Sequence, residues 1–288
     1  MAVQPAPPVY VALPGRLMPV LSGTSARAVP AKPSLFIGAS TQVVHMPTAS
    51  PQTTTRGQYV NPKALALKYR FNGDFCVHGR PVILSVDPVD SERSFLATGL
   101  RVWDGGIVLA KYLERYVPAV PRAPGRLQLR GLDLGCGTGV AGLSFALTGQ
   151  YAVLSDLGDV QAVATQANIG QNMAHIAAAG GSACFHVLDW CKLPDRAPFG
   201  YFDIVFAGDV IWHETLVEPF MNAVAWSASG PGAGEILLSH KTRDAQSIIM
   251  FEAQASKLGF ILEKKVPTEQ VLGDDGHPDV VVYHLRKR

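Results

Sequence analysis

The residues Leu132-Asp133-Leu134-Gly135-Cys136-Gly137-Thr138-Gly139 decide the fold of this 288-residue chain. Leu132 and Leu134 are typical of the end of a buried strand, and three glycines alternate through the turn that follows. Glycines allow a tight turn and leave backbone N–H groups open to a ligand, which a Cβ would block. Apolar residues at helical spacing begin at Val140, so the stretch predicts a strand, a glycine loop and a helix. The partial positive charge at such a helix start suits a carboxylate or a phosphate.

Two kinds of ligand fit this loop. Residues 137–142 match the dinucleotide pattern G-x-G-x-x-G, and Asp156 follows at about the right distance for a ribose. In a dinucleotide fold the strand should lead directly into the first glycine, whereas here Gly135-Cys136 intervenes and Asp133 precedes Gly135 by two residues. The form Asp-x-Gly-x-Gly-x-Gly resembles the cofactor loop of seven-strand methyltransferases, which bind S-adenosylmethionine. This resemblance implies that Asp133 binds the ammonium of the cofactor and Asp156 its ribose hydroxyls.

Composition narrows the class of protein further. The length suits one large α/β domain with an extension, and no apolar run reaches the ~18–20 residues of a membrane span. A net charge of +2 gives no reason to expect a nucleic-acid or membrane partner. The four cysteines lack metal-ligand spacing, so we expect no metal site and reduced thiols in a cytoplasmic protein. We also expect the protein to be a monomer.

The first part of the chain has a different composition from the rest. Residues 1–70 contain no Asp or Glu, but seven Lys or Arg and ten of the 21 prolines. Such a segment cannot bury enough apolar surface to order itself. We therefore interpret residues 1–64 as a disordered or targeting extension and residues 65–288 as the functional domain. An organelle transit peptide is also acid-poor and Ser-rich, which leaves an organelle as the alternative location.

The remaining pattern predicts an α/β fold. Alternating apolar runs between residues 65 and 86, with turn signals at Asn72-Gly73-Asp74 and His78-Gly79, predict a small N-terminal β segment. Asp104 is expected to cap the next helix. Strands at 132–134, 151–155, 184–188, 202–207 and 235–239 alternate with helices, which predicts a doubly wound, Rossmann-like parallel sheet. The final strands, 260–266 and 280–285, are expected to be separated only by a turn at 273–276, so the last strand should insert antiparallel.

Ligands in such sheets bind at the carboxyl ends of the strands. Asp189 is suited to accept a hydrogen bond from an adenine amino group, and Trp190 either packs on the purine or lies at the rim of the core. Asp209 either holds an amine or caps a helix that starts near Glu214. Trp103 either lines a pocket or only packs.

Taken together, these positions resemble the seven-β-strand protein-lysine methyltransferases of the methyltransferase-like 21 type. The resemblance runs from about residue 75 to the C-terminus. It rests on Val102-Trp103-Asp104 before the Leu-Ala-Lys-Tyr-Leu-Glu helix, the glycine loop, Ser155-Asp156, Asn168 and Asn172, Leu188-Asp189-Trp190, and Phe202-Asp203-Ile204-Val205 running into Asp209. It implies that the cofactor contacts Trp103, Gly135, Gly137, Thr138, Gly139, Asp156, Trp190 and Gly208. Asp209 would belong to an Asp-x-x-Tyr motif at the substrate mouth.

The chain departs from this pattern at two places. Trp212 stands where the motif has Tyr, which removes a phenolic hydroxyl but leaves an indole face suited to an ammonium. Gly105-Gly106 replaces the alanines usual after the Trp-Asp pair. The expected chemistry is an in-line displacement that needs a neutral, oriented amine, with Asp209 orienting and Trp212 packing.

The expected function is therefore S-adenosylmethionine-dependent methylation of a lysine ε-amine in a protein substrate. Methylation of a protein histidine or a small-molecule amine, and an inactive cofactor-binding scaffold, remain alternatives. A dinucleotide oxidoreductase is disfavoured because a lone glycine pattern is weak. The Asn/Asp-Pro-Pro-Tyr/Phe motif of nucleobase methylation is absent after residue 208, which argues against DNA or RNA adenine.

Overall fold

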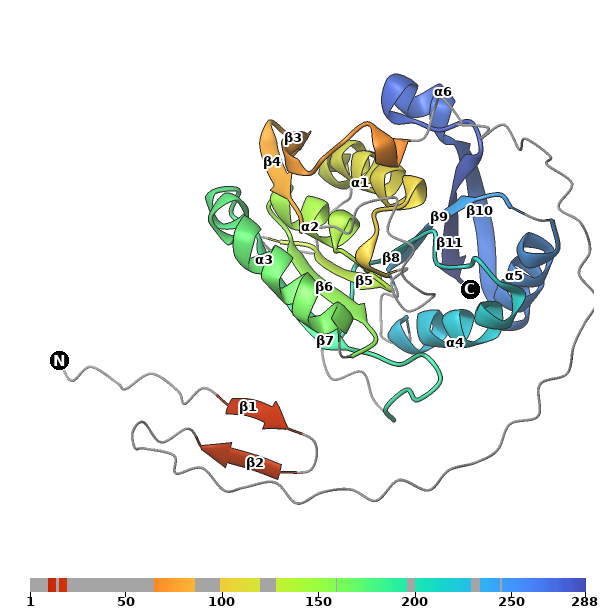
Figure 1. Ribbon diagram of the computed structural model, residues 1–288. Helices are drawn as coiled ribbons and strands as arrows, with labels where there is room; N and C mark the ends of the chain where they lie inside the picture. Colours follow the sequence, from red (N-terminus) through yellow and green to blue (C-terminus); the bar gives the residue numbers. More distant parts are fainter. Residues whose placement is uncertain are drawn as a thin grey trace, which may run out of the picture. The chain divides into compact units, whose positions relative to one another are not determined.

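The computed structural model describes residues 10–13, 16–19, 65–85, 99–119, 128–158, 160–195, 200–228, 234–243 and 245–288 (Figure 1). The chain divides into two compact units, Met1–Gly57 and Gln58–Arg288. In the first unit, strands β1 (Tyr10–Leu13) and β2 (Arg16–Pro19) form an antiparallel pair. The other residues of the extension expected over residues 1–64 lie outside those described.

The second unit is built on a seven-stranded sheet in the order β10-β11-β9-β8-β5-β6-β7. Its strands are β5 (Arg130–Leu134), β6 (Tyr151–Asp156), β7 (Ser182–Val187), β8 (Ile204–Gly208), β9 (Glu235–Lys241), β10 (Phe260–Pro267) and β11 (Val280–Lys287). The main helices are α1 (Asp104–Tyr116), α2 (Val140–Leu147), α3 (Val160–Ala178), α4 (Val217–Ser227), α5 (Ala245–Lys257) and α6 (Thr268–Leu272). Short 3-10 turns lie at Leu65–Leu67, Val117–Ala119, Glu214–Leu216 and Gly273–Asp275.

Strands β5 to β9 are parallel, whereas β11 lies between β9 and β10 and is antiparallel to both. The expected doubly wound sheet with an antiparallel last strand is therefore confirmed. The chain runs from β5 outward to β6 and β7, then returns to place β8 on the other side of β5. This change of direction creates the switch point at which α/β sheets of this kind bind ligands.

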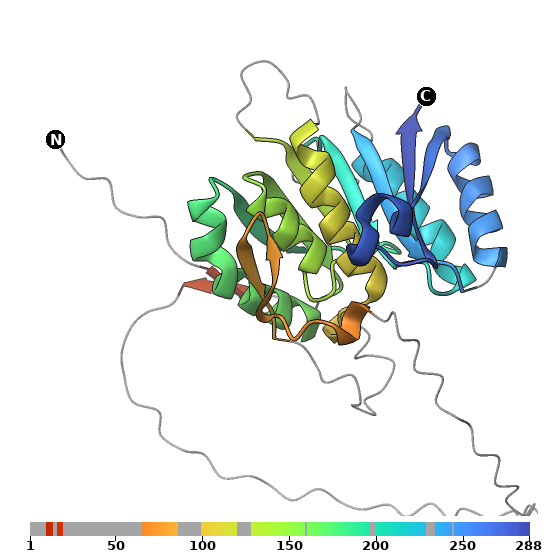
Figure 2. The same ribbon diagram turned by 90° about the horizontal axis from the view of Figure 1, so that it is seen from above.

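Helices cover both faces of the sheet (Figure 2). Leu154, Phe206 and Leu237 pack in one core cluster with α1, α2 and α3. Their strand neighbours Val153 and Val205 pack in the second cluster, with α4 and α5. Successive side chains of a strand point to opposite faces, so strands buried on both faces read as continuous apolar runs in the sequence.

The expected β segment before α1 is present as the hairpin β3 (Asn72–Val77) and β4 (Arg80–Ile83). The turn at His78-Gly79 is confirmed, and both residues have positive φ angles of 47° and 72°. The turn expected at Asn72-Gly73-Asp74 is wrong, because these residues lie inside β3 at a register shift between Asn72 and Cys76. An irregularity of this kind accommodates an extra residue without ending the strand.

Two local expectations are corrected. Asp104 does not cap α1: the helix begins at Asp104, Trp103 takes the cap position, and no side chain bonds the helix end. The Asp104 carboxylate instead accepts hydrogen bonds from Ala66 N–H at 2.9 Å and from Lys241 Nζ at 2.7 Å. The connection from β10 to β11 contains the short helix α6 as well as the expected turn. Within the described part of the chain, no helix has the length and apolarity to cross a membrane.

Candidate functional site

The glycine loop leaves β5 and is held against the end of β6. The N–H groups of Gly135 and Cys136 both donate to the carbonyl of Ser155, at 2.8 and 2.9 Å. Gly137 has φ +53°, a left-handed conformation that favours glycine. A Cβ there would lie 3.1 Å from the carbonyl oxygen of Gly99, so the segment that leads into α1 passes close to the loop. The loop is therefore enclosed on two sides by backbone.

Asp156 is the last residue of β6, at the carboxyl end of the strand, and it contacts the glycine loop directly. Its Oδ2 accepts a hydrogen bond from Gly137 N–H at 2.8 Å and its Oδ1 accepts one from Leu157 N–H at 2.7 Å. Burial raises the pKa of this carboxyl, and the two N–H donors act in the opposite direction. The structure thus brings Asp156 and the glycine loop together, as the sequence predicted.

Asp133 is fully buried and faces α2. It is 1% exposed, and its Oδ2 accepts a hydrogen bond from Gly142 N–H in α2 at 2.8 Å. Burial raises the pKa of Asp133 to about 8, so the group carries a proton at neutral pH in this structure. In this arrangement Asp133 joins β5 to the first turns of α2, and its contact with a cofactor ammonium stays a prediction.

The segments after β7 and β8 flank the glycine loop. A Cβ on Gly135 would lie 2.9 Å from Trp190 Cζ2 and 3.0 Å from Val210 Cγ1. The Trp190 ring also packs edge-on against Phe220, with ring centroids 5.4 Å apart. Trp190 therefore packs on the loop and reaches the core through Phe220, and its packing on a purine stays a prediction.

Asp189 lies beside Trp190 and is partly exposed. Its Oδ1 accepts a hydrogen bond from Cys191 N–H at 2.9 Å, and Lys192 Nζ lies 3.4 Å from its Oδ2. Both oxygens thus have partners within the same turn. The contact with an adenine amino group stays a prediction.

The asparagine pair of α3 ties the loop to the N-terminal hairpin. Asn168 donates to the carbonyl of Thr138 at 2.9 Å and accepts from Ser85 N–H at 2.8 Å. Asn172 accepts from Ile83 N–H at 2.9 Å and donates to the carbonyl of the same residue at 2.6 Å. Asn172 thus pairs with β4 as a neighbouring strand would. The two side chains hold the hairpin on the domain and fix Thr138, which is 2% exposed.

Asp209 follows β8 and has an unusual, left-handed backbone conformation. Its φ is +60°, a conformation that costs a non-glycine residue ~1–3 kcal/mol and is found at functional sites. Both carboxylate oxygens bind the guanidinium of Arg243 at 2.7 Å, and Lys241 N–H donates to Oδ1 at 3.2 Å. Asp209 does not cap the following helix, because His213 Nδ1 accepts from Thr215 N–H instead.

The start of α1 packs tightly on the ends of β8 and β9. A Cβ on Gly105 would lie 2.7 Å from Asp209 Cβ, and one on Gly208 would lie 3.0 Å from Gly106 Cα. The carbonyl of Gly105 also accepts from Ser239 Oγ at 2.7 Å. This close approach explains the glycines where the resembling proteins have alanines. It also gives Gly208 a packing role, and its cofactor contact stays a prediction.

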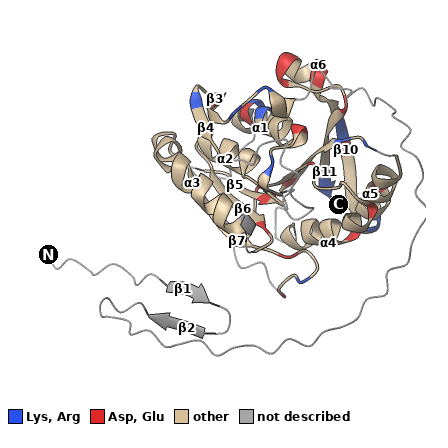
Figure 3. Ribbon diagram, in the orientation of Figure 1, with Lys and Arg blue, Asp and Glu red and all other residues tan. Residues whose placement is uncertain are grey.

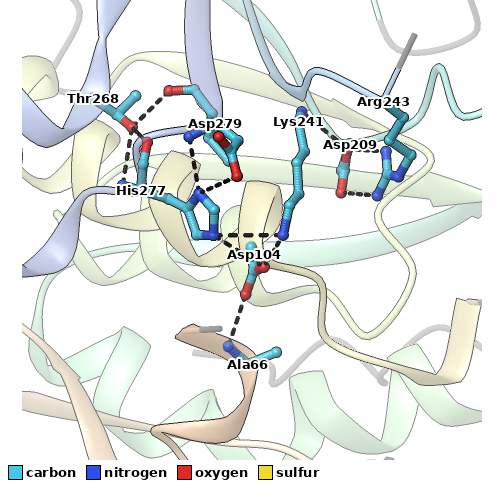
Figure 4. A network of polar contacts seen from close by, with 9 residues as sticks. Ala66, Asp104, Asp209, Lys241, Arg243, Thr268, His277 and Asp279 are labelled. Carbon is cyan, nitrogen blue, oxygen red and sulfur yellow. Dashed lines mark hydrogen bonds and ion pairs between the residues drawn. The ribbon is translucent and has the colours of Figure 1, made fainter. Parts of the chain in front are cut away.

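A second buried carboxylate lies next to Asp209, as Figure 4 shows. Lys241 donates its backbone N–H to Asp209 and its ammonium to Asp104. His277, which is fully buried, lies 3.6 Å from Asp104 Oδ2 through Nε2, and its Nδ1 accepts from Asp279 N–H at 3.1 Å. The network thus connects α1, β9 and the segment before β11.

The two tryptophans near this network are partly exposed. Trp103 is 41% exposed, and the guanidinium carbon of Arg243 lies 5.9 Å from its ring centroid. Trp212 is 39% exposed, and its ring centroid is 6.2 Å from that of His213. Trp103, Arg243 and Asp209 therefore form one continuous set of contacts, whereas the role of Trp212 toward a substrate stays a prediction.

Sequence reasoning missed Lys241 and Arg243. The strand at Glu235–Ser239 was expected to end before them, whereas β9 continues to Lys241. The signal was available, because Lys241 ends a parallel strand and Arg243 follows it, at the sheet edge where ligands bind. Their partners Asp104 and Asp209 lie far away in the sequence, so only the fold shows the pairing.

The strand order, the glycine loop at the switch point and the acidic residues after β6 and β8 define a seven-strand, Rossmann-like methyltransferase. A family model described as lysine methyltransferase matches residues 90–257, more than half of the chain. The chain belongs to this lysine methyltransferase family.

Curated relatives agree with this assignment. Protein N-lysine methyltransferase METTL21A of Mus musculus is 29% identical over 174 residues, which cover 57% of this chain and 73% of that protein. The protein of the same name from Danio rerio is 25% identical over 185 residues, covering 62% and 75%. EEF1A lysine methyltransferase 3 of Mus musculus is 26% identical over 240 residues, covering 81% and 91%.

Family and site together identify the reaction as S-adenosylmethionine-dependent lysine methylation. The residues present fit this cofactor, because backbone N–H groups hold the Asp156 carboxylate at the edge of the glycine loop, where it can accept hydrogen bonds from hydroxyl groups. The expectation of a lysine methyltransferase is confirmed, and the oxidoreductase alternative is not supported.

Proposed function

We propose that the protein methylates the ε-amine of a lysine in a folded protein substrate, at a site formed by the carboxyl ends of β5, β6 and β8. One observation carries the proposal: Val210, next to Asp209, packs on Gly135 of the glycine loop. The loop expected to hold the cofactor and the acid expected at the substrate mouth are therefore neighbours. A cofactor held by this loop would therefore lie near Asp209 and its partners.

We assign cofactor binding to residues around the loop. The proposed set is Trp103, Asp133, Gly135, Gly137, Thr138, Gly139, Asp156, Asp189, Trp190 and Gly208. Asp156 is the strongest member, because its carboxylate is already oriented by two N–H donors at the loop. Asp133 is the weakest, because its oriented oxygen faces α2.

When bound, the cofactor supplies an electrophilic methyl carbon on a positively charged sulfonium. The protein residues need to align a neutral amine and keep water out, and no strong base is needed. Asp209 is consistent with an orienting role, because its paired carboxylate holds Arg243 and the backbone of Lys241 in place. Trp212 is proposed to pack against the stem of the incoming lysine.

The cellular setting is proposed on less direct grounds. All four cysteines are free, and no group of metal-ligating residues occurs in the described part of the chain. We propose a cytoplasmic monomer that acts on protein and not on nucleic acid, with residues 65–288 as the catalytic domain and residues 1–64 as a dispensable extension. An organelle is the alternative location if the extension is a transit peptide.

The test is transfer of a labelled methyl group from S-adenosylmethionine into an extract of cells that lack the protein. We expect label on one or a few lysines, mapped by mass spectrometry. Label on histidine or on a small-molecule amine would replace lysine as the acceptor. Tight cofactor binding without transfer to any protein would support the inactive scaffold.

A further inference from the structure

The acceptor side of the site presents cations to solvent. Two carboxylates lie there, Asp104 and Asp209, and their side chains are only 9% and 1% exposed. Each is paired at 2.7 Å with a more exposed cation, Lys241 at 24% and Arg243 at 35%. Each carboxylate is thus more buried than the cation that pairs with it (Figure 4).

The neighbouring helices α2 and α3 carry no charged side chains that could offset these cations. Neither α2 nor α3 carries any Lys, Arg, Asp or Glu, as the uncoloured ribbons in Figure 3 show. These two helices therefore add no charge to the two ion pairs at the start of α1 and the ends of β8 and β9. Neither Asp104 nor Asp209 is exposed enough to attract a lysine ammonium by itself.

Arg243 still has donors to offer. A guanidinium has five N–H bonds, and the paired contact with Asp209 uses one on each terminal nitrogen. Asp209 holds the group in a fixed plane, and the ring of Trp103 lies on it at 5.9 Å. The pairing with Asp209 raises the pKa of Arg243, so the group stays charged. A fixed, partly exposed guanidinium is suited to a planar carboxylate.

We propose that Arg243 is a specificity-determining residue that binds a carboxylate of the substrate beside the target lysine, so that the enzyme prefers lysines with a neighbouring Asp or Glu. This inference rests on the proposed function. The acidic neighbour supplies the attraction that Asp209 cannot supply, and the same cationic surface favours the neutral form of the incoming amine. Neutral amine is the form that can attack the sulfonium methyl.

The test starts from the substrate mapped in the extract experiment. The Asp and Glu residues next to the methylated lysine are changed to Asn and Gln, and kcat/KM is compared for parent and neutralised substrate. The parent enzyme should lose about tenfold or more with the neutralised substrate. Arg243→Gln should be slower with the parent substrate and should discriminate less than about twofold between the two substrates. Affinity for S-adenosylmethionine, measured by calorimetry, reports cofactor binding separately.

Arg286→Gln is the matched control. Arg286 is a partly exposed arginine paired with Glu263 at 3.1 Å, and it lies in β11, opposite Ile261 of the edge strand β10. This variant should keep the full discrimination.

Two results would overturn the inference while leaving lysine methylation intact. One is a mapped lysine without an acidic neighbour, and the other is undiminished discrimination by Arg243→Gln. Absence of lysine methylation in the extract would instead overturn the proposed function, and the inference with it.

Discussion

The carboxyl group of Asp133 in β5 accepts a hydrogen bond from the backbone N–H of Gly142 in α2, at 2.8 Å. The two residues are separated by the whole glycine loop, so this bond closes the loop at its base. A Cβ on Gly142 would lie 2.9 Å from the same oxygen, which leaves no room for any other residue there. A buried acid whose pKa burial raises to about 8 therefore closes the glycine loop.

This burial predicts a pH dependence of stability. The pKa of Asp133 is raised from 3.8 to about 8 in the folded protein. The folded state therefore holds a proton that the unfolded state releases, and the stabilisation present below pH 3.8 is lost as pH rises to about 8. Asp133→Asn keeps an acceptor but cannot ionise. The free energy of unfolding of the parent should fall relative to the variant by up to ~1.4 kcal/mol per pH unit between pH 5 and 8.

Urea unfolding of both proteins at several pH values measures this difference. A constant gap across that range would show that Asp133 is ionised in the folded protein. Calorimetry on the same variant also tests the expected ammonium contact, because loss of that contact would lower the affinity for S-adenosylmethionine.

Replacement of Asp156 by Ala should weaken cofactor binding. The change removes the carboxylate that the N–H groups of Gly137 and Leu157 orient at the edge of the loop. We expect a loss of ~1.5–3 kcal/mol in the free energy of S-adenosylmethionine binding, the usual cost of losing hydrogen bonds to a charged group. Asp274→Ala, in the exposed 3-10 turn before β11, is the control and should leave the affinity unchanged. Unchanged affinity in Asp156→Ala would remove Asp156 from the cofactor site.

Gly105→Ala should disturb the site by crowding. The new methyl group would lie 2.7 Å from Asp209 Cβ, so either α1 or Asp209 has to move. Overpacking of this kind costs ~1–3 kcal/mol of unfolding free energy, and here it should also lower kcat. Gly170→Ala, within α3, is the matched control because a Cβ there meets no atom within 4 Å. That variant should be as stable as the parent or more so, since alanine favours helix. A fully active and stable Gly105→Ala protein would show that this contact relaxes freely.

Replacement of Trp212 by Tyr should preserve most of the activity, whereas replacement by Ala should lower it strongly. If the indole packs on the stem of the incoming lysine, Trp212→Tyr keeps an aromatic wall, and activity should stay within about tenfold, or ~1.4 kcal/mol of barrier. Trp212→Ala should lower turnover by ~10²-fold, because small displacements of a reactant cost that much. Single-turnover methyl transfer with parallel cofactor titration separates the two steps. Transfer by the alanine variant at the parental rate would make Trp212 a packing residue.

The sequence by itself determined the parts of this protein that depend on local pattern. The apolar runs and three alternating glycines predicted strand, loop and helix in the right order, because burial on both sheet faces and a tight turn each have a local signature. The last two strands were expected to be separated only by a turn, which predicted the antiparallel insertion of β11, although the short helix α6 also lies between them. The sequence also predicted that Asp156 lies near the glycine loop, because the loop follows β5 and Asp156 ends the neighbouring parallel strand β6.

Only the tertiary structure decided how the charges are paired. From the sequence, Asp104 was expected to cap a helix and Asp209 either to hold an amine or to cap a helix. In the structure they pair instead with Lys241 at the end of β9 and with Arg243 just after it. Asp133 reads as a ligand-binding acid, yet it is buried against α2. The reason is physical: a carboxylate's role depends on its burial and on the charges within a few ångströms. Those neighbours come from segments that only the folded chain brings together.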